Sequence, residues 1–401
     1  MIMNNKLIGG ILLIVGTSIG GGMLALPIAT AQLGFINAFI ALVLCWAVMT
    51  LSALLILEVN LWHPVNSNLI TMAKTTLGTF GQIIAWTSYL SLLYALLAAY
   101  IAGGSDFFQH LLLTFHITVS TKISALLFTA LLSLVVYKGL RSVDYINRGL
   151  MFSKLFTFIL LALCIFPFIS IDYLLTLANP YSTTMILGSI TVIMTSFGFA
   201  VIVPSLRSYF KNDLLMLRKT ILIGSLIPLF CYVIWEIAIM GVIPAQGNPS
   251  LTLMYHSGHS ASDLMMALSN LLHNRLINLL AKIFTSICLA TSFLGVALSL
   301  FDFLSDGLKI KKRALNKFVL YVLTFLPPFL IANHYPHIFI IALSYAGVLC
   351  ALLLILLPAM MAWSGRYIKK SAIGYRLAGG KFLLISLITI ALFIIVLSLI
   401  N

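Results

Sequence analysis

Long, nearly uncharged apolar segments follow one another along most of this 401-residue chain, and they constrain its fold more than any other feature. A helix needs about 20 apolar residues to cross a bilayer, and only helices and closed barrels satisfy their backbone groups there. Windows of about 19 residues place apolar spans near 7–33, 35–61, 81–104, 121–137, 149–169, 183–206, 218–243, 276–305, 316–332, 337–361 and 382–400. The sequence therefore predicts an all-α polytopic membrane protein with about eleven transmembrane helices.

The composition excludes a water-soluble globule, because 62% of the residues are hydrophobic and only 8% are charged. A net charge of +14 does not indicate nucleic acid here, since no basic run is interleaved with aromatic residues on a polar face. Of the 23 Lys and Arg residues, nineteen fall on one side of the predicted spans, three fall on the other, and Lys154 lies within a span. The positive-inside bias then predicts a cytoplasmic N-terminus, and the odd number of spans places Asn401 in the periplasm.

Two spans carry residues that interrupt a helix. The first contains the segment Gly16-Thr17-Ser18-Ile19-Gly20-Gly21-Gly22, and the sixth contains Thr195-Ser196-Phe197-Gly198-Phe199, followed by Pro204. Each glycine costs a helix about 1 kcal/mol relative to alanine, so we expect an unwound stretch between two half-helices in the first span. The same break argues against removal of this span as a signal peptide.

The two breaks fall at corresponding positions if the chain contains inverted repeats of five helices each. We expect the repeats to occupy residues 1–169 and 170–361, with a cytoplasmic loop and one additional helix in residues 362–401. The alternative is that the glycines only allow helices to pack closely, as in small-xxx-small contacts.

A break at mid-membrane frees backbone groups that need polar partners. The amides of Gly21, Gly22 and Met23 at the start of a half-helix suit a carboxylate. The carbonyl groups around the two breaks suit an ammonium group or a small cation, and an α-amino acid presents both charges on one carbon. The expected substrate-binding residues are Val15, Gly16, Thr17, Ser18, Gly20, Gly21, Gly22, Met23, Thr195, Ser196, Phe197, Gly198 and Phe199.

Few ionisable residues lie within the spans, and each is a functional candidate because its burial is expensive. Lys154 either snorkels to the cytoplasmic face or occupies a cation position beside Thr291 and Ser292, where a change of protonation would couple transport to a proton gradient. Glu236, nearer the middle of its helix, is a second proton candidate. Glu58 lies at the end of the second helix, where we expect it to be interfacial.

No motif predicts a metal, a cofactor or an enzyme. Asp302 and Asp306 share a helix face, but Lys309 is placed to pair with Asp306. The HxxH pairs at 256–259 and 334–337 have no third ligand at a recognised spacing. The five cysteines are isolated in apolar stretches, which argues against disulfides, and the sequences HExxH, GxSxG and GxxxxGK[ST] do not occur.

Several segments together resemble the hydroxy/aromatic amino acid permeases, part of the amino acid/polyamine/organocation transporter superfamily. The matching segments, in chain order, are 16–27 (GTSIGGGMLALP), 57–59 (LEV), Asn147-Arg148 with Lys154 beyond it, 195–199 (TSFGF), 290–298 (ATSFLGVAL) with Phe301-Asp302, 324–328 (TFLPP), 345–347 (YAG) and 374–376 (GYR). The resemblance covers nearly the whole chain.

This resemblance implies a proton-coupled importer of aromatic amino acids in a bacterial inner membrane, with no cofactor and with tyrosine as the expected substrate. It also implies that the glycines of the first break and residues 195–199 bind the substrate backbone, and that Lys154 acts in coupling. The chain departs from the family pattern at Ala200-Val201, where a polar residue is common, and at Glu236, where glutamine is expected. Tryptophan or broader neutral amino acid transport, sodium coupling, and a non-transporting membrane sensor or assembly subunit remain the alternatives.

Overall fold

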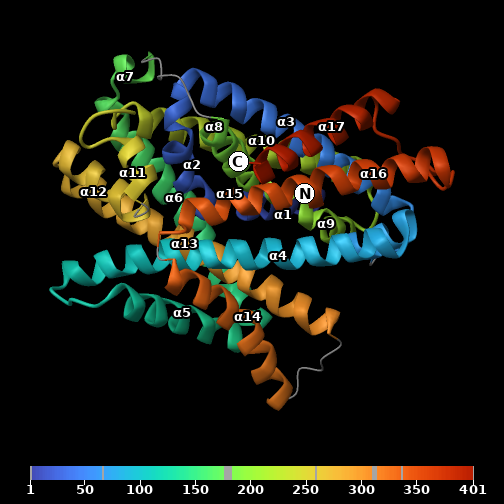
Figure 1. Cartoon of the computed structure of the whole chain (residues 1–401), viewed down its shortest axis with the longest axis horizontal. Helices are drawn as coiled ribbons and strands as arrows, with labels where there is room; N and C mark the ends of the chain where they lie inside the picture. The colour runs from blue at the N-terminus through green and yellow to red at the C-terminus, as the bar shows by residue number, and fades with distance from the viewer. Residues whose placement is uncertain are drawn as a thin grey trace.

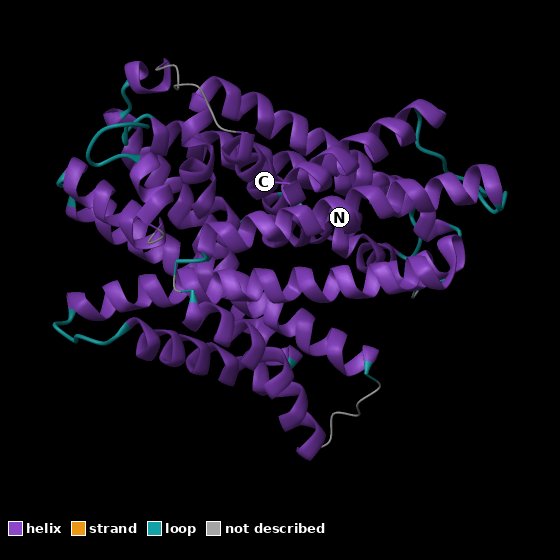
Figure 2. Cartoon of the chain, in the orientation of Figure 1, coloured by secondary structure: helices purple, strands orange, loops and turns teal. Residues whose placement is uncertain are grey.

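The computed structural model describes residues 2–65, 67–175, 183–257, 260–308, 314–335 and 337–400. All regular secondary structure in these ranges is helical (Figure 2). The first crossing consists of α1 (Ile2–Ser18) and α2 (Gly21–Thr30), and Gly34, with φ of 71°, then turns the chain into α3 (Gly34–Leu61). Counted in this way, the apolar helices of the described residues make the eleven crossings that the sequence predicts.

Eight further crossings follow α3 and its loop, with one more at the C-terminus. They are α4 (Leu69–Thr114), α5 (Thr121–Tyr137), α6 (Leu140–Ile165), α8 (Thr183–Ser196) with η3 (Gly198–Ile202) and α9 (Val203–Phe210), α10 (Leu214–Met240), α13 (Arg275–Gly307), α14 (Ala314–His334), α15 (Phe339–Cys350) with η4 (Ala351–Leu356), α16 (Leu357–Trp363) and η5 (Ser364–Ile368), and α17 (Gly380–Ile400). Shorter helices connect them: η1 (Ala31–Leu33), η2 (Phe166–Phe168), α7 (Ile171–Leu175), α11 (Leu251–Ser257) and α12 (Ser260–Leu272).

Side-chain caps fix where several crossings begin. Asn68, Ser120, Asp213 and Asn274 each accept a hydrogen bond from a backbone N–H in the first turn of α4, α5, α10 and α13, respectively. Such caps satisfy amides that have no partner within the helix. The element α4 is longer than the predicted span 81–104, and a kink at Gly78, whose φ is 80°, separates its first turns from the rest of the helix.

The long helix α4 runs through the middle of the molecule (Figure 1). It packs against α13 and α15, and also against α5 and α14. On the other side of the molecule, α1 packs against α10, and α8 packs against α15 and α2. The contact between α8 and α15 is especially close, because a Cβ atom on Gly347 would lie 2.0 Å from the backbone oxygen of Thr191.

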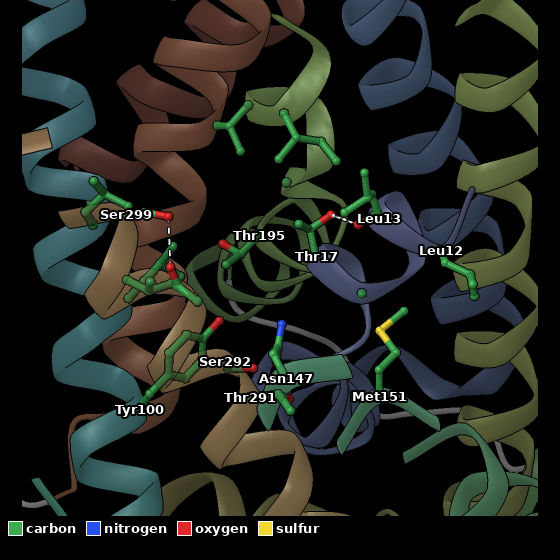
Figure 3. Close-up of a pocket in the computed structure, with 18 of the residues that line it drawn as sticks. Leu12, Leu13, Thr17, Tyr100, Asn147, Met151, Thr195, Thr291, Ser292 and Ser299 are labelled. Carbon is green, nitrogen blue, oxygen red and sulfur yellow. Dashed lines mark hydrogen bonds between the residues drawn. The ribbon is translucent and has the colours of Figure 1, made fainter. Parts of the chain in front are cut away.

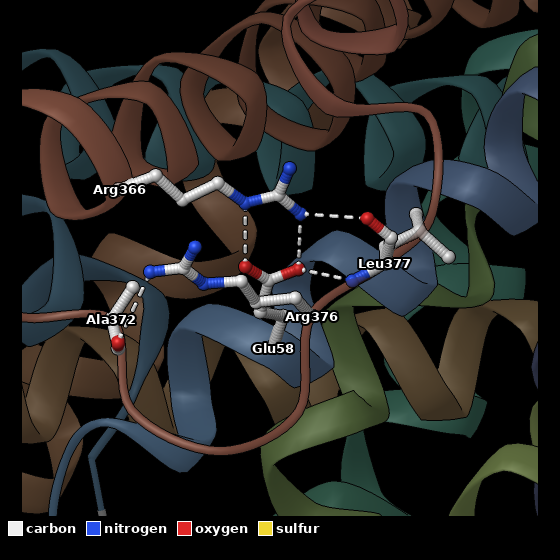
Figure 4. A network of polar contacts seen from close by, with 5 residues as sticks. All are labelled: Glu58, Arg366, Ala372, Arg376 and Leu377. Carbon is white, nitrogen blue, oxygen red and sulfur yellow. Dashed lines mark hydrogen bonds and ion pairs between the residues drawn. The ribbon is translucent and has the colours of Figure 1, made fainter.

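A buried ion pair joins segments that are far apart in the sequence. Glu58 is 0% exposed and lies near the C-terminal end of α3. Arg366 donates from Nε and Nη2 to its two carboxylate oxygens at 2.7 and 2.5 Å, and the amide of Leu377 donates to the same carboxylate at 2.8 Å (Figure 4). Because burying either charge alone would be costly, this pairing ties α3 to η5 and to the loop before α17.

Candidate functional site

The first predicted break is present. Helix α1 ends at Ser18, and α2 begins at Gly21 after Gly20, whose backbone is extended. The freed backbone groups meet side chains of other helices: the amide of Gly21 donates to Ser292 Oγ at 2.8 Å, and the carbonyl of Ile19 accepts from Lys154 Nζ. The break therefore lies against α6 and α13.

Three consecutive glycines allow this close packing. A Cβ atom on Gly20 would lie 2.2 Å from Ser292 Oγ, and one on Gly21 would lie 2.6 Å from the ring of Tyr100. On Gly22 it would lie 2.8 Å from Ser196 Oγ, which belongs to the second break. Within the described part of the chain, the amides of Gly20 and Gly22 have no hydrogen-bond acceptor. Two backbone donors therefore remain open at the start of α2, where the helix dipole favours an anion.

The second break separates α8 from η3 at Phe197, and a buried tyrosine connects it to the first. Tyr232 Oη, on α10, lies 2.6 Å from the carbonyl oxygen of Ser18 and 2.8 Å from that of Ser196. Its ring packs edge-on against Phe197, with ring centroids 5.0 Å apart. A single hydroxyl thus serves the C-terminal ends of α1 and α8, where carbonyl groups have no partner within the helix.

Lys154 is 1% exposed, so its ammonium does not reach an aqueous face in this structure. Besides the carbonyl of Ile19, Nζ is 3.4 Å from Thr291 Oγ1. No ion pair links it to a carboxylate among the described residues. Lys154 therefore lies between α1, α6 and α13, as in the prediction that places it at a cation position. Ser292, however, contacts Gly21 and not Lys154.

A cavity of about 580 Å³ ends at the two breaks (Figure 3). One face of each of four helices lines it: α1 from Gly9 to Thr17, α4 from Tyr89 to Tyr100, α6 from Asn147 to Phe152, and α13 from Thr291 to Ser299. Thr195 and Gly198 close its end at the second break. This volume is in the range of small-molecule binding pockets.

The predicted substrate-binding residues divide into two groups. Those that line the cavity are Gly16, Thr17, Thr195 and Gly198, together with the predicted coupling residues Thr291 and Ser292. The others lie behind this wall, largely or completely buried: Val15, Ser18, Gly20, Gly21, Gly22, Met23, Ser196, Phe197 and Phe199. The structure thus brings both breaks together but buries the two phenylalanines of the second break in the core.

Glu236 lies apart from the cavity. It is fully buried on α10, and its Oε1 accepts a hydrogen bond from Thr30 Oγ1 of α2 at 2.9 Å. Its Oε2 has no hydrogen-bond partner among the described residues. A half-satisfied carboxyl group in this position is unusual, because buried polar atoms nearly always find partners.

Three residues that contribute to this region were not predicted. Tyr232 and Tyr100 contact the breaks, and Asn147 lines the cavity. Tyr232 precedes Glu236 by one helical turn, so a polar stripe on an otherwise apolar helix was the available signal. Among the described residues, no three His, Cys, Asp or Glu side chains lie close enough together to hold a metal ion. His259 and Lys309 lie outside the described residues.

Comparisons with known proteins show the family to which the chain belongs. The sequence profile of the tryptophan/tyrosine permease family matches residues 3–398. A tyrosine-specific transport system of Haemophilus influenzae is 36% identical over 96% of this chain and 93% of its own length. The tryptophan-specific transport protein of the same bacterium is 32% identical over 94% of this chain and 92% of its own. A glutamine transporter of Aliivibrio fischeri is 33% identical over 90% of this chain and 89% of its own length. The chain therefore belongs to the tryptophan/tyrosine permease family.

Proposed function

We propose that this permease imports an aromatic amino acid, most readily tyrosine, together with protons across a bacterial inner membrane. The observation that carries the proposal is the cavity that ends at two broken helices. The positive end of the α2 dipole at the first break favours the substrate carboxylate, and the nearby carbonyl groups favour its ammonium. The relatives named for tyrosine and tryptophan transport support the choice of substrate.

Packing between the helices supports a division into inverted repeats at residues 1–169 and 170–361. The third crossing of the first half, α4, packs on α15, which belongs to the fifth crossing of the second half. Correspondingly, α13 is the third crossing of the second half and packs on α6, the fifth of the first. Such reciprocal contacts are expected of two repeats related by an axis in the membrane plane.

The charge distribution supports a cytoplasmic N-terminus and a periplasmic C-terminus. The cavity then lies in the cytoplasmic half of the molecule, because its lining includes Gly9 of α1, Arg148 of α6 and Tyr209 of α9. We assign this arrangement to the inward-facing state. Rocking of the broken helices against α4 and α13 would open the same site to the periplasm.

The position of Lys154 supports proton coupling. Its ammonium occupies the space between the carbonyl of Ile19 and the hydroxyl of Thr291, where a sodium ion would otherwise find oxygen ligands. Deprotonation of Lys154 would remove a charge from the wall of the first break and free the Ile19 carbonyl. Glu236, whose carboxyl group contacts Thr30 of α2, is the second candidate proton carrier.

Uptake into proteoliposomes tests the proposal. Purified protein is reconstituted, and uptake of radiolabelled tyrosine is measured under an imposed pH gradient and, separately, under a sodium gradient. Accumulation driven only by the pH gradient is the expected result. Accumulation driven only by sodium contradicts proton coupling, and binding without any uptake favours a sensor or assembly subunit.

A broader neutral amino acid permease is the second candidate, and the similarity to a glutamine transporter favours it. Unlabelled tyrosine, tryptophan and glutamine are therefore compared as competitors in the same assay. Competition by the two aromatic amino acids alone supports the aromatic assignment, and strong competition by glutamine contradicts it.

A further inference from the structure

The side-chain amide of Asn147 is a polar group of the cavity that neither the breaks nor the coupling proposal uses. Seven residues separate it from Lys154, which is about 10 Å or two turns along α6, so both side chains lie on one helix face. Lys154 contacts the first break, and Asn147 lines the cavity two turns away. Figure 3 shows the amide pointing into the cavity, with Tyr100 on one side and Met151 on the other.

Several of the hydroxyl groups that line the cavity are already engaged. Four of them each donate to a backbone carbonyl oxygen at 2.8 Å: Thr17 to Ile14, Thr195 to Leu343, Thr291 to Ile287 and Ser299 to Gly295. Ser292 accepts from Gly21 instead. The Asn147 amide makes no hydrogen bond with any residue that the structure describes. Its donors and its acceptor are therefore free for a ligand.

Much of the cavity wall is apolar, although Tyr89, Arg148 and Tyr209 also line it. Helix α4 presents Leu92, Leu93 and Leu96 to the cavity at helical spacing, and α1 presents Leu12 and Leu13. Such walls accept an aromatic ring, but they cannot by themselves distinguish tyrosine from phenylalanine, which differ only by a hydroxyl group. A site that hydrogen-bonds a substrate hydroxyl rejects the analogue without it far more strongly than an apolar pocket does.

We infer that Asn147 is a specificity-determining residue whose amide hydrogen-bonds the phenolic hydroxyl of tyrosine when the amino acid head group lies at the breaks. The inference rests on the proposed function, because it takes the substrate to be an aromatic amino acid bound in this cavity. An amide suits a phenol because each can both donate and accept. The ring then lies between the apolar faces of α4 and α1.

Competition assays test this inference. Uptake of radiolabelled tyrosine by reconstituted protein is inhibited with unlabelled tyrosine and with unlabelled phenylalanine. The readout is the half-inhibitory concentration of phenylalanine divided by that of tyrosine. Asn147→Leu keeps a similar volume but removes the hydrogen bonds. We expect the ratio to fall about tenfold, chiefly through weaker binding of tyrosine, while phenylalanine inhibits almost as in the wild type.

Ser299→Ala provides the matched control, because Ser299 lines the same cavity but its hydroxyl is already bonded within α13. This control is expected to keep the wild-type ratio. If Asn147→Leu does not insert, Asn147→Ala is assayed in its place, together with the thermal stabilisation of the purified variant by each amino acid.

The outcomes separate the two proposals. Absence of tyrosine uptake by the wild type overturns the proposed function. A wild type that transports tyrosine but shows no preference over phenylalanine overturns the assignment of Asn147, as does a variant that keeps the wild-type ratio. An equal fall of the ratio in Ser299→Ala also contradicts it, because a general change of cavity polarity would then explain the effect.

Discussion

Replacing Tyr232 by phenylalanine tests whether the two breaks are held together by one hydroxyl. The substitution keeps the ring and its contact with Phe197 but removes the donor that lies 2.6 and 2.8 Å from the carbonyl oxygens of Ser18 and Ser196. Both carbonyl groups end half-helices in the protein interior. The perturbation is therefore limited to one lost hydrogen-bond donor.

The size of the effect follows from the desolvation of these carbonyl groups. A hydroxyl has one proton, so its removal leaves at least one buried acceptor without a partner, at a cost of about 1–3 kcal/mol. If this cost falls on the substrate-bound state more than on the free state, tyrosine affinity drops by roughly 5- to 150-fold. The part of this cost that is common to both states lowers the stability of the folded protein.

The assay combines thermal melting of the purified protein with the concentration dependence of tyrosine uptake. Tyr94→Phe is the matched control, because the Tyr94 hydroxyl donates to a single carbonyl, that of Leu323, at 2.7 Å and lies away from the breaks. Both variants are expected to melt at lower temperature, but only Tyr232→Phe is expected to raise the KM for tyrosine. An unchanged KM in Tyr232→Phe, or an equal rise in Tyr94→Phe, would refute the reasoning.

Three further substitutions give distinct expectations. Lys154→Ala should retain exchange of tyrosine across the membrane but lose accumulation driven by a pH gradient, and undiminished accumulation in proteoliposomes would exclude a coupling role. Gly21→Val should insert at normal levels yet abolish uptake, because a side chain there meets the Tyr100 ring at 2.6 Å; wild-type uptake rates would remove Gly21 from the site. Glu58→Gln leaves the buried Arg366 guanidinium without a counter-charge and should destabilise the protein by about 3–5 kcal/mol. Its melting temperature should therefore be lower than that of Asp213→Asn, which alters only an exposed helix cap.

The sequence predicts the crossings and the first break well because both depend on local composition. Apolar stretches of bilayer length have few alternatives, and the glycines from Gly16 to Gly22 weaken a helix wherever it packs. The second break has a weaker signal, since Gly198 and Pro204 are both compatible with a continuous crossing. In the structure, α8 ends at Ser196, shortly before Gly198, and α9 begins with Pro204 in its first turn.

Long-range partners could not be predicted in the same way. Glu58 and Arg366 are separated by 308 positions, so the sequence shows two charges near helix ends but not their burial against each other. Lys154 had two possible positions, and packing of α6 against α13 selects the interior one. Nothing in the order of residues indicates that the Tyr232 hydroxyl reaches both breaks, because this depends on the crossing of α10 with α1.

A crystal structure of the purified protein with L-tyrosine tests the central claim most directly. We expect the amino acid in the cavity, with its carboxylate at the first break near Gly16 and Thr17 and its ring directed along the apolar face of α4. Tyrosine bound elsewhere, or bound in the cavity with its carboxylate away from both breaks, would contradict the account.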